Sequence, residues 1–183
     1  MSRHLILISG KARAGKDTFS IGLDGYQKYS FAGQLKEFAE KLGWDGKKDE
    51  RGRKFLQDLA SVVREYNSNT WIRILWYLLD DEGYPDKVVI TDCRYLNEIQ
   101  LMKQWSLLHN YKVTTIRIER PGFDNGLTEA QKNHPSETEL DNYPFDYVIK
   151  NSGTIGDLMC IAYSCFASGA HSELTLQDGR TSF

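Results

Sequence analysis

The feature that most constrains the fold is a loop with two glycines close to the N-terminus. The apolar run HLILIS at residues 4–9 is short and nearly continuous, as expected of a strand covered on both faces in a parallel sheet. It leads directly into GKARAGKDT, in which Gly10 is followed after four residues by Gly15 and Lys16. A strand, a tight loop and a helix therefore follow one another here, and this order is typical of an α/β fold.

The spacing of this loop is that of a phosphate-binding loop. Its glycines permit positive φ angles and a close approach of phosphate oxygens. Successive backbone N–H groups and the N-terminus of the next helix form an anion cradle, and Lys16 can reach the β- and γ-phosphates of a nucleoside triphosphate. Lys11 and Arg13 add positive charge where a transferred phosphoryl group would lie. The alternative is a glycine-rich turn that carries a surface lysine.

One position of the loop departs from the usual pattern. A Ser or Thr normally follows the lysine and offers its hydroxyl to magnesium, whereas here Asp17 follows and Thr18 comes next. Phosphate repels a carboxylate unless a cation lies between them or the carboxylate faces a second substrate. We therefore interpret Asp17 as a metal ligand or as a contact to an acceptor. An acidic residue favoured by the helix dipole is the alternative.

Strands and helices alternate along the rest of the chain. Further strands are predicted at 28–31, 88–92, 112–118 and 146–150. Helices are predicted at 32–43, 53–66, 70–81, 96–109 and 154–167. This alternation predicts a three-layer α/β sandwich around a largely parallel, five-stranded sheet.

Three segments add to this minimal pattern. The helices at about 32–82 form an insertion between the second and third strands. The segment 120–143 holds two prolines and two glycines and is too long for an ordinary connection, so it is interpreted as a lid or a decorated loop. Within it, Ser136 and Glu139 are spaced as a capping box. We expect residues 1–168 to form one domain and the polar residues 169–183 to form a C-terminal tail.

Composition and charge narrow the classes of function. The 183 residues carry a formal net charge of −2, which gives no general basic surface for nucleic acid or an anionic membrane. No apolar run is long enough to span a bilayer and no signal peptide is evident, so a cytoplasmic protein is expected. The three cysteines form no CxxC pair and indicate neither a disulfide framework nor a zinc site.

A second group of polar residues follows the apolar run VVITD. Asp92 ends this predicted strand and Arg94 comes two residues later, at the edge of the sheet where open α/β folds bind ligands. Asp92 suits water-mediated magnesium binding, although capping of the next helix is an equal alternative. Arg94 suits bidentate capture of a phosphate.

In this order, SGKARAGKDT, KYSFAGQLKEF, VVITDCRYLNE and HPSETELD resemble the deoxynucleoside monophosphate kinases of bacteriophage type, which belong to the P-loop kinase group. The resemblance covers residues 4 to about 160. It implies an enzyme of nucleotide biosynthesis, in the host cytoplasm if the source is viral. With ATP and Mg²⁺, this enzyme would phosphorylate deoxynucleoside monophosphates to diphosphates. The accepted bases, the exclusion of ribose and the existence of a homodimer stay open.

Motifs and resemblance together predict the site residues. The predicted catalytic residues are Lys16, Asp17, Arg94 and Arg120. The predicted ATP-binding residues are Gly10, Lys11, Arg13, Ala14, Gly15, Lys16, Asp17, Thr18, Asn151 and Gly153. The predicted acceptor-binding residues are Asp17, Ser30, Lys36, Gln57, Arg64, Trp71, Arg94 and Glu137. The predicted metal ligands are Asp17, Thr18 and Asp92.

The charges of the helical insertion differ in their setting. Arg64 lies within the apolar pattern LASVVREY, so an inward arginine with an anionic partner is expected. Arg51 and Arg53 are interpreted as solvated charges on a helical face.

Two other functions remain open from the sequence. One is a P-loop kinase for a different small phosphorylated acceptor, as in a phosphomevalonate kinase, whose loop has a similar basic GKD form. The other is a nucleotide-binding switch module. Arg94 and the long predicted lid speak against a simple switch, which needs neither.

Overall fold

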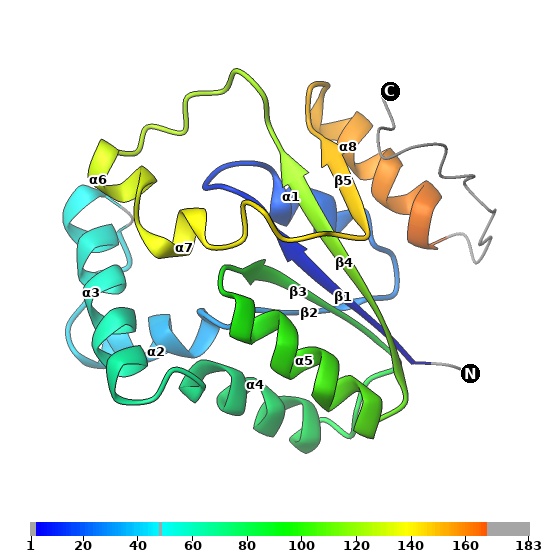
Figure 1. Cartoon of the computed structure of the whole chain (residues 1–183), viewed down its shortest axis with the longest axis horizontal. Coiled ribbons are helices and arrows are strands. Elements are labelled where there is room, and N and C mark those ends of the chain that lie inside the picture. The colour runs from blue at the N-terminus through cyan, green and yellow to red at the C-terminus, as the bar shows by residue number, and fades with distance from the viewer. Residues whose placement is uncertain (1–2, 48, 168–183) are drawn as a thin grey trace.

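The computed structural model describes residues 3–47 and 49–167 (Figure 1). Five parallel strands form one sheet in the order β2-β3-β1-β4-β5. These strands are β1 (Arg3–Ser9), β2 (Gln27–Tyr29), β3 (Lys87–Cys93), β4 (Tyr111–Glu119) and β5 (Tyr147–Lys150). The predicted three-layer α/β fold with a parallel five-stranded sheet is confirmed. The predicted tail at 169–183 lies outside the described residues.

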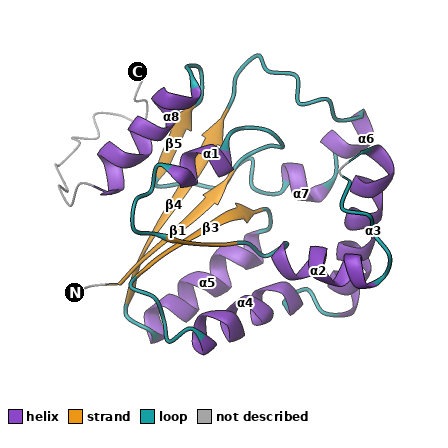
Figure 2. Ribbon diagram, turned by 180° about the vertical axis from the view of Figure 1, so that it is seen from behind, coloured by secondary structure: helices purple, strands orange, loops and turns teal. Residues whose placement is uncertain are grey.

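Helices cover both faces of the sheet and extend beyond one end of it. They are α1 (Lys16–Ile21), α2 (Gly33–Lys41), α3 (Glu50–Tyr66), α4 (Thr70–Asp81), α5 (Leu96–Leu108), α6 (Glu129–Lys132), α7 (Pro135–Thr138) and α8 (Ile155–Ala162), which continues into a π-helical turn. Figures 1 and 2 show α1 and α8 on one face and α4 and α5 on the other. Helices α3, α6 and α7 lie beyond the carboxyl ends of the strands, which is where a ligand would bind.

The continuous apolar run of β1 reflects burial on both faces. Leu5 and Leu7 face one core with residues of α2, α3, α4 and α5, whereas Ile6 and Ile8 face a second core with residues of α1 and α8. Because successive side chains of a strand point to opposite faces, a strand between two helical layers is apolar at most of its positions. No helix in the described ranges is both long and apolar enough to cross a membrane.

The predicted lid contains two short helices, and the predicted capping box is wrong. Pro135 occupies the first turn of α7 and fixes its start, so the cap is His134, whose side chain accepts a hydrogen bond from the Ser136 backbone N–H (3.2 Å). Glu139 instead accepts a bond from the Leu96 N–H at 2.7 Å. It therefore ties α7 to the start of α5.

Candidate active site

The phosphate loop has the geometry that its glycines allow. Gly10 and Gly15 have φ angles of 150° and 105°. A Cβ atom at Gly10 would lie 2.4 Å from the Ile118 carbonyl oxygen, and one at Gly15 would lie 2.6 Å from Asn151 Nδ2. Only glycine fits both positions without a shift of its neighbours. Asn151 also donates to the Ala14 carbonyl at 2.9 Å and so holds the loop against the end of β5.

Lys16 is folded back onto its own loop. Its Nζ donates to the carbonyl oxygens of Gly10 and Lys11, each at 2.8 Å. Burial, followed by the charge of Arg94, lowers the pKa of Lys16 from 10.5 to about 7. The loop therefore holds an amine that titrates near neutral pH and that an incoming phosphate would favour in its charged form.

Asp17 lies at the border of the loop with an exposed carboxylate. Its Oδ1 accepts a hydrogen bond from Lys28 Nζ at 2.7 Å, and its side chain is 81% exposed. Partial burial opposes ionisation, but the hydrogen bond and charge of Lys28, with the charge of Lys16, lower the pKa of Asp17. Asp17 is therefore ionised, and its exposed pairing with Lys28 costs little to break.

Two cavities meet at the phosphate loop. One has a volume of about 680 Å³ and lies between the loop, the helical insertion and α7, and the other has about 330 Å³ and lies between the loop and the start of α8. Arg13, Lys16 and Asp17 line both cavities. A ligand in each would therefore approach the other across these three side chains.

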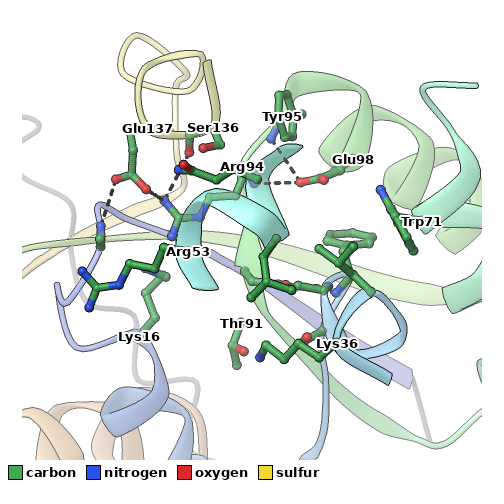
Figure 3. Close-up of a pocket in the computed structure, with 18 of the residues that line it drawn as sticks. Lys16, Lys36, Arg53, Trp71, Thr91, Arg94, Tyr95, Glu98, Ser136 and Glu137 are labelled. Carbon is green, nitrogen blue, oxygen red and sulfur yellow. Dashed lines mark hydrogen bonds and ion pairs between the residues drawn. The ribbon is translucent and has the colours of Figure 1, made fainter. Parts of the chain in front are cut away.

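The predicted residues divide between the two cavities. The predicted acceptor residues Asp17, Ser30, Lys36, Gln57, Arg64, Trp71, Arg94 and Glu137 all line the larger one, part of which Figure 3 shows. The predicted ATP-side residues Arg13, Gly15, Lys16, Asp17, Thr18, Arg120, Asn151 and Gly153 line the smaller one. Gly10, Lys11 and Ala14 line neither of the two, because they form the loop beneath them.

Arg94 is paired with a carboxylate of α7. Its Nη1 donates to Glu137 Oε1 and, at 3.2 Å, to the Ser136 carbonyl oxygen. The other oxygen of Glu137 accepts a bond from the Ala12 backbone N–H at 2.9 Å. Helix α7 therefore touches both the phosphate loop and the arginine that we predict to bind the acceptor (Figure 3).

Glu98 is the anionic partner expected for Arg64. Arg64 Nη2 donates to Glu98 Oε1 at 2.8 Å, and its guanidinium lies 4.1 Å from the centre of the Tyr95 ring. The other oxygen of Glu98 accepts bonds from the backbone N–H groups of Arg94 (2.7 Å) and Tyr95 (3.1 Å). Glu98 is 2% exposed, and burial, opposed by the Arg64 charge, raises its pKa to about 7. The sequence reasoning missed Glu98, which fixes the backbone of Arg94.

Asp92 has a different contact from the two that we considered. Its carboxylate accepts bonds from the backbone N–H groups of Phe31 (2.8 Å) and Ala32 (2.9 Å). It therefore holds the start of α2 rather than capping the helix that follows β3. Both oxygens keep further lone pairs, so the predicted metal role of Asp92 stays a prediction.

Arg53 and Trp71 enter the larger cavity from the insertion. The interpretation of Arg53 as a solvated charge is wrong, because its side chain is half-buried and lines the cavity. Trp71 is 5% exposed, and its buried Nε1 has no hydrogen-bond partner among the described residues. Arg51 is exposed, as expected.

The residues at the loop can accommodate Mg²⁺ together with phosphates. The described ranges hold no cluster of three or more His, Cys, Asp or Glu side chains suited to a metal ion. Mg²⁺ in phosphate-transfer sites takes one or two carboxylates, substrate phosphates and water. Asp17 offers a carboxylate and Thr18 a hydroxyl beside Lys16, so these side chains would fit Mg²⁺ bound together with phosphates.

Comparisons with known proteins identify the fold. No protein-family model and no curated protein matches the sequence. A proposed kinase from Chloroflexus aurantiacus has a similar structure, with 15% identity, a TM-score of 0.54, and coverage of 92% of this chain and 98% of that one. TT1252 from Thermus thermophilus is also similar, with 18% identity, a TM-score of 0.50, and coverage of 91% and 98%. The chain thus shares its α/β fold with these two solved structures.

Proposed function

We propose that this chain is a deoxynucleoside monophosphate kinase that transfers the γ-phosphoryl group of ATP to the phosphate of the acceptor. The observation that carries this proposal is the meeting of two cavities at Arg13, Lys16 and Asp17. A nucleotide-binding switch needs one nucleotide site, whereas a kinase needs two sites that share the transferred group. We assign residues 1–168 to one kinase domain, with the acceptor insertion at about 32–82 and the lid at about 120–143.

The smaller cavity is the proposed donor site. Lys16 and the backbone N–H groups of the loop would bind the phosphates, and the turn at Asn151 and Gly153 would border the adenine. Arg120 lies at the start of the lid with its guanidinium 3.8 Å from the centre of the Phe123 ring. It lines this cavity, where it could reach the transferred phosphoryl group.

The larger cavity is the proposed acceptor site. Its volume of about 680 Å³ suits a nucleotide. Its lining combines cationic side chains, such as Arg94 and Arg53, with apolar and aromatic ones, such as Phe31 and Trp71. A phosphate with an attached nucleoside can use both kinds of side chain, whereas phosphomevalonate has no aromatic part.

The proposed reaction is an in-line displacement. An oxygen of the acceptor phosphate forms a bond to the γ-phosphorus of ATP, the bond to the β,γ-bridging oxygen breaks, and ADP leaves. Because the acceptor oxygen is already anionic, no strong general base is needed. Lys16 and Arg94 would hold the two phosphates in line and stabilise the charge of the transition state. Mg²⁺, held at Asp17 and Thr18, would neutralise charge on the donor phosphates.

A coupled assay of ADP release tests this proposal. The chain is assayed with ATP and Mg²⁺ against a panel of deoxynucleoside monophosphates, ribonucleoside monophosphates and phosphomevalonate. Turnover is expected with one or more of the deoxynucleotides. If only another phosphorylated compound is turned over, that compound and not a deoxynucleotide is the acceptor. If no acceptor accelerates ATP hydrolysis, the switch module is favoured.

A further inference from the structure

The carboxylate of Glu137 lies where two anion-binding groups converge. Oε2 accepts a hydrogen bond from the Ala12 N–H of the phosphate loop at 2.9 Å, and Oε1 accepts one from Arg94. The side chain is only 6% exposed. Figure 3 shows it reaching from α7 toward Arg94 and the loop. A buried anion thus bridges the donor loop and the predicted acceptor arginine.

The rest of α7 and the turn after it accept the hydrogen bonds of the neighbouring Lys11. Lys11 Nζ donates to the Glu137 carbonyl oxygen at 2.6 Å and to Asp141 Oδ2 at 2.7 Å. Asp141 is fixed in turn by Arg117 of β4, whose Nη2 lies 2.6 Å from Asp141 Oδ1. The lid therefore supplies oxygen acceptors to Lys11, to Ala12 N–H and to Arg94.

These donors are the type of group that binds phosphate. A backbone N–H at a phosphate loop and a guanidinium both prefer an anionic oxygen, and a carboxylate offers two of them. Glu137 supplies these anionic oxygens from within the chain. A second anion cannot take both bonds while Glu137 keeps them, and like charges at this distance repel.

We propose that Glu137 is an internal occupant of the acceptor-phosphate site and determines the specificity for phosphorylated acceptors. This inference rests on the proposed kinase function. A phosphate can replace the carboxylate because it satisfies both Arg94 and the Ala12 N–H. Water or an uncharged alcohol brings no negative charge to replace that of the carboxylate beside Arg94, so Glu137 stays in place and limits transfer of the phosphoryl group to them. Glu137 is thus displaced by the acceptor and is not one of its ligands.

Binding of inorganic phosphate tests this proposal without any nucleotide. Isothermal titration calorimetry of the full chain compares the wild type with Glu137→Gln and Glu137→Ala. Removal of the competing charge is expected to tighten phosphate binding about tenfold or more, as expected for a charge-assisted hydrogen bond. Glu139→Gln is the matched control, because Glu139 ends the same helix but contacts Leu96 N–H instead of the loop. This control is expected to bind phosphate as the wild type does.

The opposite result would show a different role. If both Glu137 variants are folded, as judged by thermal unfolding, and bind phosphate equally or more weakly, Glu137 only positions Arg94 and the proposal is overturned. A second measurement is ADP release in the absence of acceptor, which is expected to rise several-fold in Glu137→Gln and not in Glu139→Gln. An unchanged basal rate would contradict the effect on water.

The two proposals can fail separately. If the wild type turns over no deoxynucleotide but the Glu137 variants bind phosphate more tightly, the assignment of the acceptor fails. The proposal that Glu137 occupies the phosphate site then still stands. If deoxynucleotides are turned over while phosphate binding does not tighten, the kinase function stands and the role of Glu137 is refuted.

Discussion

The protonation of Lys16 gives a quantitative prediction for the binding of ATP. Burial and the Arg94 charge lower the pKa of Lys16 to about 7 in the empty loop. A bound triphosphate brings negative charge within a few ångströms of Nζ and so favours the ammonium form. Binding must therefore raise this pKa, and a proton must be taken up wherever the empty loop holds the neutral amine.

The size of the effect follows from the two pKa values. At pH 8 an amine with a pKa of 7 is roughly nine-tenths neutral, so binding takes up close to one proton; at pH 6 it takes up roughly one-tenth. The pKa of Lys16 is raised on binding, so affinity is highest below pH 7 and falls by up to about tenfold per pH unit above it. A full return to 10.5 corresponds to a linkage of roughly 5 kcal/mol as an upper bound.

Calorimetry in buffers of different ionisation enthalpy measures this proton directly. A non-hydrolysable ATP analogue is titrated at pH 8 and pH 6, and the slope of the observed enthalpy against buffer ionisation enthalpy gives the protons taken up. Lys16→Met is expected to abolish the uptake at pH 8. Lys54→Met, which removes an exposed lysine of α3 paired with Asp58, is the control that should retain it. No uptake by the wild type at pH 8 would refute the reasoning.

Three further substitutions, one with a matched control, test the acceptor assignment and the role of Glu98 in stability. Arg94→Ala is expected to lower kcat/KM for the monophosphate about 100-fold, with little change in the affinity for ATP. The reason is that it removes charge-assisted bonds to the acceptor phosphate. An equal loss of kcat/KM for the monophosphate and of affinity for ATP would indicate a structural role. Arg53→Ala is expected to raise KM for the monophosphate about tenfold, whereas the exposed Arg51→Ala should leave it unchanged, and equal effects would contradict the assignment. Glu98→Ala is expected to lower the free energy of unfolding in urea by about 3–5 kcal/mol, since it strands Arg64 and two backbone N–H groups; a loss under about 1 kcal/mol would show that water replaces the carboxylate.

Local signals in the sequence were sufficient to predict the fold and the position of the loop. The glycines at 10 and 15 follow a strand that is buried on both faces, and few folds contain this combination. Arg94 could be placed near the loop because the carboxyl ends of parallel strands meet at one edge of the sheet. Asn151 was placed there by the resemblance to a known family.

Side-chain partners that lie far apart in sequence could not be predicted in this way. Glu137 meets Ala12 across 125 residues, and Asp92 meets the start of α2 across about 60. For Asp92 the next helix was a plausible local partner, and the tertiary contact prevailed. The prediction for Arg53 failed for a related reason: its position at a cavity depends on how α3 packs beyond the carboxyl ends of the strands (Figure 1), which the local sequence does not show.

The carboxylates at the site differ in how easily they can release their cations. Glu98 is almost fully buried and is also held by two backbone N–H groups, so its bond to Arg64 should persist when a ligand binds. The exposed Asp17 can leave Lys28 at little cost. Glu137 lies between these extremes, because it is buried but belongs to a helix of four residues. We therefore expect Lys28 to become available to any anion, Arg94 only to a phosphate that replaces Glu137, and Arg64 to none.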